Sequence, residues 1–546
     1  MRKILIYFSL ILFVSCSVSN EDKDITIFKN ASFYNDEYTN IEVQSIAVED
    51  GIIIEIGDFK NLESKYQSAE IIDLDSSLIF PGFNDAHCHF FGYAFNLAES
   101  CDLTDTKSLD EIITRLKIYD EKYNPDFIYA RGWDQNDWEN TEMPDWTELN
   151  KTFPEKPVLL IRIDGHAALI NEKAAEIAGI TPETVVEGGE IVTQDGKLTG
   201  LLIDMAIEKV RIYLPDLTFK QVEDAIMMTQ DSSLKYGLTS LTDAGLDKKQ
   251  IMFLDSLQKA GDLKIRINAM LSPSEDNFEY FENEFESTDL IKISSVKLFS
   301  DGALGSRGAC LLNEYSDVPG RYGFIIEEVD YYKEVCQYAY DHNLQVCTHC
   351  IGDSANRLML DIYSEFLQGE NDRRWRIEHA QVVNEKDIDK FGKYSIIPSI
   401  QSTHATSDMY WAEARLGSER INHAYQTRRL LDQNGWLPNG TDFPVEDISP
   451  IETFYAAIFR QDKKYYPEGG FLNSQCLTRQ EALKSITFWP AMASFDEIVK
   501  GKIKEGMYAD FIILDRDIIK CSKEDVLEAK VLQVWIGGEK VWGGSD

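Results

Sequence analysis

"TFKQVEDAIMMTQDSSLKYG" (residues 218–237) runs directly into "LTSLTDAG" (residues 238–245), and this pair of segments carries the repeating unit of the fold. In the first segment apolar residues recur every three to four positions, which is the spacing of one face of an amphipathic helix. The second segment is short, rich in leucine and threonine, and closed by a glycine, as is typical of a strand. The pair predicts a helix followed by a strand, the unit that repeats in parallel α/β folds.

Strand-like runs, separated mostly by helix-sized intervals, recur along the chain. One run precedes residue 87, and the others are "IRINAML" (265–271), "SSVKLFSDG" (294–302), "LQVCTHCIG" (344–352), "RWRIEHAQ" (374–381), "SIIPSIQSTH" (395–404) and "GWLPNGTDFPV" (435–445). Together with residues 238–245 they predict an α/β fold, a (β/α)8 TIM-like barrel with its chemistry at the carboxyl ends of the strands. A doubly wound parallel sheet is the competing fold.

The two ends of the chain are rich in strands and lack a long helix. "SIAVEDGIIIEIG" (45–57) surrounds an Asp-Gly pair that is typical of a hairpin, and the C-terminal segments have the same character. We predict a small composite β-sandwich domain from residues 25–80 and 500–546, with the barrel over residues 81–499. The stretch from about 95 to 215 is too long for one strand-to-helix connection, so it is predicted to be an insertion after barrel strand 1.

The N-terminal segment "MRKILIYFSLILFVSCSVSNEDKD" has a basic start, an apolar run and a small residue before Cys16. It resembles a bacterial lipoprotein signal, which predicts a signal peptide over residues 1–15, a lipid on Cys16 and a tether over residues 16–24. The apolar run is too short to remain as a spanning helix. The expected location is the bacterial cell envelope, lipid-anchored at the outer membrane or facing the periplasm. An ordinary cleaved signal peptide is the alternative.

Composition limits the partners of the chain. Its 546 residues, 44% of them hydrophobic, can bury a large core. A formal net charge of −39, carried by acids along the whole chain, argues against nucleic acid as a partner. The expected partners are therefore a small-molecule substrate and, through the anchor, a membrane.

Polar residues stand at the ends of several predicted strands. His87 and His89 in "PGFNDAHCHFFG" share one face of a strand and can converge on one ion, although such pairs also occur on wet surfaces. The further candidates are Lys297, His349, His379 and Asp442. Taken singly, each of these four residues also has a structural explanation. Lys297 could be an ion-paired strand lysine, His349 and His379 could be core histidines, and Asp442 could cap the next helix. Because strand ends meet on one face of a barrel, the six together predict one metal site.

The motifs that carry a family resemblance are "PGFNDAHCH", "VKLFSDGALGSRGA", "HCIGDSANRLMLD", "RWRIEHAQ", "QSTHATSD", "GTDFPVE", "GMYADFIILD" and "RIDGHAALIN". They resemble the amidohydrolase superfamily, and more narrowly its amidohydrolase-3 group of metal-dependent hydrolases, over nearly the whole chain after the leader. The resemblance implies a metal shell of His87, His89, Lys297, His349, His379 and Asp442. It also implies that carbon dioxide carboxylates Lys297, which then bridges two metal ions.

The residue types indicate the chemistry. Imidazole and carboxylate ligands suit one or two divalent metal ions, with zinc expected. Such ions would turn a shared water into hydroxide, which attacks a carbonyl carbon, and Asp442 would act as the general base and hand the proton to the leaving nitrogen. The expected enzyme is an amidohydrolase of carbon–nitrogen bonds other than peptide bonds, in amides or formamide-like compounds. An esterase or lactonase on the same site and a non-catalytic ligand-binding surface lipoprotein are the alternatives.

Four more residues are candidates for contact with the substrate. His404 and His166 resemble family residues that face the substrate, and His404 is predicted to be catalytic. Arg307 in "GSRGA" fits either an acidic substrate group or an ion-pair strut. Trp133 fits either the lining of the pocket or the core of the insertion.

Overall fold

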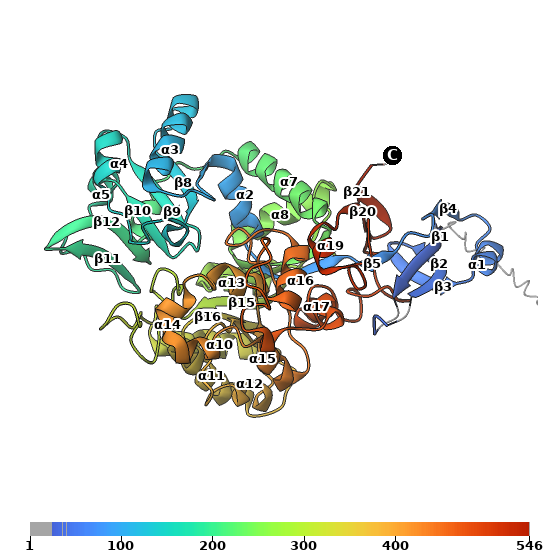
Figure 1. The fold of residues 1–546 in the computed structure, drawn as a ribbon. Coiled ribbons are helices and arrows are strands. Elements are labelled where there is room, and N and C mark those ends of the chain that lie inside the picture. The colour runs from blue at the N-terminus through green and yellow to red at the C-terminus, as the bar shows by residue number, and fades with distance from the viewer. Residues whose placement is uncertain (1–24, 35–36, 40, 545–546) are drawn as a thin grey trace, which may run out of the picture.

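The computed structural model describes residues 25–34, 37–39 and 41–544. The predicted signal peptide, the predicted lipidation site Cys16 and the predicted tether lie outside these residues. Within the described ranges, no helix combines the length and the apolar character that a membrane crossing requires. Figure 1 shows a central barrel, with an inserted sheet and the sheet of the N-terminal strands at opposite ends of the molecule.

A parallel sheet forms the centre of the molecule. In the part of the chain that the structure describes, it has seven strands in the order β18-β17-β16-β15-β14-β13-β6. Their bounds are β6 Phe83–Cys88, β13 Leu238–Leu246, β14 Arg266–Leu271, β15 Ile291–Phe299, β16 Gln345–Cys350, β17 Arg376–His379 and β18 Ile397–Ser399. Nearly every residue of these strands is buried, as expected where helices cover the outside and side chains fill the inside. The predicted TIM-like barrel is confirmed.

An irregular segment fills the eighth position of the barrel, so the prediction of a regular eighth strand is wrong. Asn439 forms an isolated bridge with Ile400, at the end of β18. The N–H of Asp442 donates to the carbonyl oxygen of His87, on β6, at 2.8 Å. Proline residues on both sides of the segment lack the N–H that a strand ladder needs. The segment nevertheless closes the barrel, because it bonds to both neighbouring strands.

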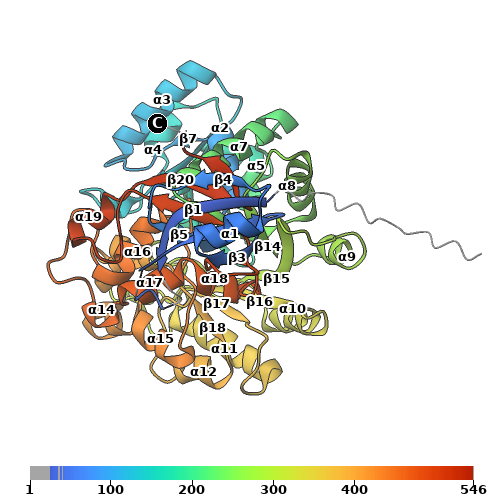
Figure 2. The ribbon, with the colours of Figure 1, turned by 90° about the vertical axis from the view of Figure 1, so that its right-hand side faces the viewer.

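Helices surround the barrel, as Figure 2 shows. They are α7 Phe219–Lys235, α8 Lys248–Ala260, α9 Glu275–Asn283, α10 Val329–Asp341, α11 Asp353–Leu367, α12 Asp389–Lys393 and α15 Thr427–Asn434. A capping box starts α7: the side chain of Thr218 accepts the N–H of Gln221, and the Gln221 side chain accepts the N–H of Thr218. The helix and strand predicted over residues 218–245 are therefore α7 and β13.

Two small sheets lie beside the barrel. The sheet ordered β3-β2-β1-β4 consists of N-terminal strands, and the sheet ordered β21-β20-β19-β5 joins C-terminal strands to the N-terminal strand β5. Their strands are β1 Ile25–Tyr34, β2 Ile41–Glu49, β3 Ile52–Gly57, β4 Glu70–Asp73, β5 Ile79–Pro81, β19 Phe511–Leu514, β20 Val531–Ile536 and β21 Glu539–Trp542. The ring of Phe28 contacts those of Phe511 and Trp535, with centroids 5.3 and 5.0 Å apart. Apolar side chains from the two ends therefore bury one another.

A separate mixed sheet, ordered β11-β12-β10-β9-β8-β7, follows the first barrel strand and forms the predicted insertion. Its elements and the helix before it are α2 Phe90–Glu99, β7 Cys101–Asp102, α3 Leu109–Tyr123, β8 Ile128–Trp133, α4 Thr147–Thr152, β9 Val158–Arg162, β10 Ala167–Ile170, α5 Glu172–Ala178, β11 Gly189–Gln194 and β12 Lys197–Asp204. Apolar clusters pack on both faces of this sheet. The turn between β9 and β10 carries polar residues to the barrel mouth.

Candidate metal centre

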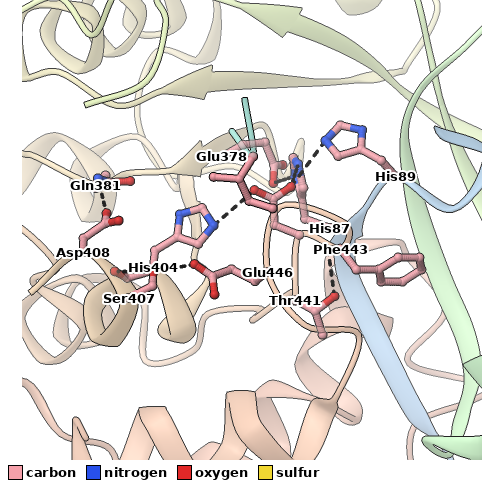
Figure 3. Close-up of polar contacts among 12 residues, drawn as sticks. His87, His89, Glu378, Gln381, His404, Ser407, Asp408, Thr441, Phe443 and Glu446 are labelled. Atoms are coloured by element: carbon pink, nitrogen blue, oxygen red, sulfur yellow. Dashed lines mark hydrogen bonds and ion pairs between the residues drawn. The ribbon is translucent and has the colours of Figure 1, made fainter. Parts of the chain in front are cut away.

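Among the described residues, two groups of metal-binding side chains share one aspartate at the barrel mouth. His87, His89 and Asp442 form the first group, with ligand atoms within 4.8 Å of one another. Asp442 Oδ1 lies 3.3 Å from His89 Nε2 and 3.5 Å from His87 Nε2. Figure 3 shows the two histidines at the end of the same strand. The two histidines therefore converge on the same carboxylate oxygen, as predicted.

His379, His404 and Asp442 form the second group, within the same 4.8 Å limit. His379 ends β17 with a left-handed φ of 69°, and Asp442 has a φ of 62°. Such backbone conformations are unusual outside glycine and cluster at functional sites. His404 lies in α13 (Ser402–Asp408), just beyond β18, and its Nε2 is 3.2 Å from Asp442 Oδ2. A helix, rather than a strand end, therefore presents this predicted catalytic residue.

Lys297 and His349 lie next to these two groups. The Nζ of Lys297 is 3.4 Å from His87 Nε2, and the residue is 1% exposed. The ring centroid of His349 is 4.6 Å from that of His379. All six predicted ligands therefore lie together at one end of the barrel. His349 lies beside the two groups, next to His379, and belongs to neither.

Burial favours the neutral form of four basic side chains at this site, His87, Lys297, His349 and His379. It lowers the pKa of His87 to about 4, and the charge of Lys297 acts in the same direction. Burial also lowers the pKa of Lys297. The pKa values of His349 and His379 lie well below the ordinary value, again chiefly because both rings are buried. Neutral imidazole is the form that binds a metal ion.

The pKa values of Asp442 and His404 are shifted in opposite directions, so that both side chains are ionised near neutral pH. Burial would raise the pKa of Asp442, but hydrogen bonds from His404 and His89 hold it well below its ordinary value. Burial would lower the pKa of His404, but its hydrogen bond to Asp442 and the charge of Glu446 raise it to about 9. The Asp442 carboxylate is therefore available as a ligand or as a base.

Two charged residues that the sequence analysis missed orient His87. Its Nδ1 donates to Glu378 Oε2 at 2.6 Å, which directs Nε2 toward the site (Figure 3). The other oxygen, Oε1, lies 2.6 Å from Arg376 Nε. Burial would raise the pKa of Glu378, but Arg376 and His87 hold it well below its ordinary value. The signal was the sequence "RIEH", because two charges inside a barrel strand require partners.

Asp85 ties the irregular closing segment to β6. Its Oδ1 accepts the N–H groups of His87 and Thr441, both at 3.0 Å, and its Oδ2 accepts the Thr441 hydroxyl at 2.6 Å. Glycine is required at position 440, because a Cβ there would lie 2.5 Å from the amide nitrogen of His87. These contacts fix the position of Asp442 relative to His87. Asp85 is another position that the sequence analysis missed, although it shares a strand face with His87.

A cavity of about 860 Å³ adjoins the centre, and the insertion supplies part of its wall. His166 lies in that wall, so the structure brings it to the site. Its Nδ1 donates to Asp204 Oδ1 at 2.6 Å, and its ring centroid is 4.9 Å from that of His349. A cavity of this size can hold a small organic substrate beside the metal-binding side chains.

Arg307 and Trp133 do not line this cavity. The Nη2 of Arg307 pairs with Asp317 Oδ2 at 2.7 Å, which agrees with the ion-pair strut rather than with a substrate contact. Trp133 is 1% exposed, and its indole N–H donates to the carbonyl oxygen of Leu160 at 3.0 Å. The prediction that Trp133 binds substrate is wrong, because the ring is part of the core of the insertion.

Arg131 and Arg162 line the cavity instead, and neither was predicted. Arg162 is held by Asp134 and by Asp164, whose Oδ2 lies 2.5 Å from Nη1. Arg131 donates from Nη2 to the carbonyl oxygen of Ile163 at 3.1 Å. An arginine inside an apolar strand run such as "VLLIR" was the available signal.

The donor set fits a divalent metal ion. His379 Nδ1 is buried and has no hydrogen-bond partner among the described residues. Such an atom requires a partner, and a cation can accept the lone pair of a neutral imidazole. Imidazole nitrogen and carboxylate oxygen are ligands of zinc and similar ions.

Comparison with known proteins agrees with this geometry. The model of a family described as "Amidohydrolase family" matches residues 70–542. The chain belongs to the amidohydrolase family. This amidohydrolase is 29% identical to Protein LONG AFTER FAR-RED 3 of Arabidopsis thaliana, over 94% of this chain and 91% of that protein. It is 22% identical to N-substituted formamide deformylase of Arthrobacter pascens, over 94% of this chain and 98% of that protein.

A solved structure shows the same fold. The crystal structure of an uncharacterized metal-dependent hydrolase from Pyrococcus horikoshii OT3 matches this amidohydrolase with a TM-score of 0.74 and 28% sequence identity. The match covers 92% of this chain and 99% of that chain. The likeness between the two structures therefore extends over nearly the whole of both chains.

Proposed function

We propose that this amidohydrolase is a metal-dependent hydrolase of carbon–nitrogen bonds in amides or formamide-like compounds. The observation that carries the proposal is the pair of donor groups that share Asp442 beside a large cavity. The residues that would hold one or two metal ions are His87, His89, Lys297, His349, His379 and Asp442. A divalent ion, zinc by preference, would supply a Lewis acid and make a coordinated water acidic enough to react near neutral pH. The name of the relative from Arthrobacter pascens supports the choice of bond.

Asp442 is proposed to move the proton. Its low pKa keeps the carboxylate ionised, so it can accept a proton from the attacking water. The leaving nitrogen of the substrate then takes this proton, because an amine leaves readily only when protonated. His404, with a pKa raised to about 9, is a cation 3.2 Å from this carboxylate and can polarise the substrate carbonyl.

Lys297 is proposed to be carboxylated. Burial lowers its pKa and so favours the neutral amine, which is the form that attacks carbon dioxide. The attack forms one N–C bond, releases one proton and leaves a carbamate with two oxygen ligands. Since Lys297 Nζ lies 3.4 Å from His87 Nε2, these oxygens would enter the centre directly.

Rates on matched substrates test the proposed bond. The zinc-loaded protein is given N-substituted formamides and acetamides, and esters with the same acyl and leaving groups. We expect hydrolysis of an amide or formamide, loss of that rate in His87→Ala, and retention of the rate in Arg307→Gln, because Arg307 lies outside the cavity. Hydrolysis of esters alone would make the assignment of the bond wrong. A metal-loaded protein that cleaves neither class would contradict the proposed activity.

A further inference from the structure

A second, much smaller cavity lies next to the metal centre. Its volume of about 10 Å³ leaves room for one ligand the size of a water molecule. The lining includes two histidines of the centre, His379 and His404, together with Gln401, Tyr425 and Arg460. The proposed function does not use this cavity, and the metal site does not explain Gln401 and Arg460 in its lining.

Arg460 is a buried cation without an anionic partner. It follows α16 (Pro450–Phe459) and is 1% exposed. Its Nε donates to the carbonyl oxygen of Phe471 at 3.0 Å, and its Nη2 donates to that of Tyr425 at 3.2 Å. No carboxylate of the described residues forms an ion pair with it, and burial lowers its pKa to about 10. The guanidinium is still protonated near neutral pH, and an isolated buried charge is strongly unfavourable.

Gln401 supplies an independent observation. It precedes α13 and is 5% exposed, and both its Nε2 and its Oε1 are buried without a hydrogen-bond partner in the described part of the chain. Buried amides are nearly always paired, so this one points to a ligand. Gln401 and Arg460 both belong to the lining of the small cavity. Two donors thus surround a space for one small acceptor.

We propose that this cavity binds one small monovalent anion, such as chloride, between the Arg460 guanidinium and the Gln401 amide. An anion accepts hydrogen bonds from both groups and compensates the buried positive charge. A water molecule fits the space but leaves that charge uncompensated, and a cation is repelled by Arg460. Because the same cavity is lined by His379 and His404, the bound anion supports the wall behind the metal centre.

Crystals of the metal-loaded protein grown in sodium bromide test this site directly. An anomalous peak is expected in the small cavity, within hydrogen-bonding distance of Gln401 and Arg460. In Gln401→Glu the new carboxylate becomes a permanent counterion, so the peak should disappear. A peak that persists in Gln401→Glu identifies an adventitious ion only. A wild-type cavity that contains only water in bromide also overturns the proposal.

Thermal unfolding provides a second measurement in solution. At constant ionic strength, replacing gluconate by bromide should raise the Tm of the wild-type protein by roughly 1 °C for each tenfold increase above the dissociation constant. Gln401→Glu should not respond, whereas Gln194→Glu, at an exposed position, should respond like the wild type. If Gln401→Glu does not fold, Arg460→Met should show the same loss of response. Equal responses in the wild type and in the folded cavity variant contradict an anion site.

Discussion

His87 and His89 are two residues apart in the sequence, but they stand in different surroundings. The side chain of His87 is 0% exposed and is held by Glu378, whereas that of His89 is 30% exposed and borders the large cavity. We call His87, Lys297, Glu378 and Arg376 the support side of the centre. We call His89, His404 and Asp442 the cavity side.

The difference between the two sides separates two tasks. The support side is buried, and Glu378 is paired with both Arg376 and His87, so this side can hold ligand atoms in one geometry. The cavity side meets the substrate and contains the ionised Asp442 and His404 pair. Changes on the support side should therefore remove metal, and changes on the cavity side should mainly remove turnover.

The largest effect is expected on the support side at Lys297. Lys297→Ala should lose bound metal and activity together, because the proposed carbamate ligand can no longer form. Metal analysis and the hydrolysis rate are measured on the same samples, and short-chain carboxylates should restore part of both. Lys292→Ala is the matched control, since Lys292 lies on the same strand but pairs with Asp496. Full metal content in Lys297→Ala would show that Lys297 is not a ligand.

Asp442→Asn tests the cavity side. The amide oxygen keeps a ligand of similar size but cannot take a proton, so metal content should change little while kcat falls by about 10²–10⁴-fold. Asp447→Asn, at an exposed aspartate of the same cavity, controls for the loss of one negative charge. Near wild-type turnover would assign the proton transfer to another group. Loss of metal in step with activity would place Asp442 with the support side.

Glu378→Gln tests the support side without removing a predicted ligand, because Glu378 holds His87 and is not itself a predicted ligand. The variant keeps its shape but no longer fixes the orientation of His87 by charge, so metal affinity should fall by about 10–100-fold. Competition with a chelator measures this affinity. Glu385→Gln, with a side chain that is 64% exposed, should bind metal like the wild type. Unchanged affinity in a folded Glu378→Gln would remove Glu378 from the support side.

The smallest catalytic effect is expected at Cys16, far from both sides in the sequence. Cys16→Ala should leave kcat unchanged and should release the protein from the membrane fraction. Rates in detergent and the distribution between membrane and soluble fractions are compared with the wild type. A variant that still sediments with membranes would rule out the lipid anchor.

The sequence predicted the parts of the site that depend on local pattern. Strand periodicity placed His87, His349 and His379 at the mouth of one barrel, because parallel strands share their carboxyl end. The segment that closes the barrel was harder to predict. Its prolines prevent a regular strand ladder, and single hydrogen bonds to the neighbouring strands hold it in place instead. Local sequence patterns could not predict the hydrogen-bond and ion-pair partners that hold the other candidate residues in place. Trp133 is fixed by the carbonyl oxygen of Leu160, and this contact is specified only by the folded insertion.

Zinc titration of the chelator-stripped protein tests whether hydrolysis depends on a metal ion bound at the barrel mouth. Bound zinc per chain and the rate of hydrolysis are measured at each addition. We expect that the stripped protein is inactive, and that activity rises in step with zinc until one or two ions per chain are bound. Full activity in the stripped protein, or zinc binding that leaves the rate at background on every amide and formamide tested, would contradict this expectation.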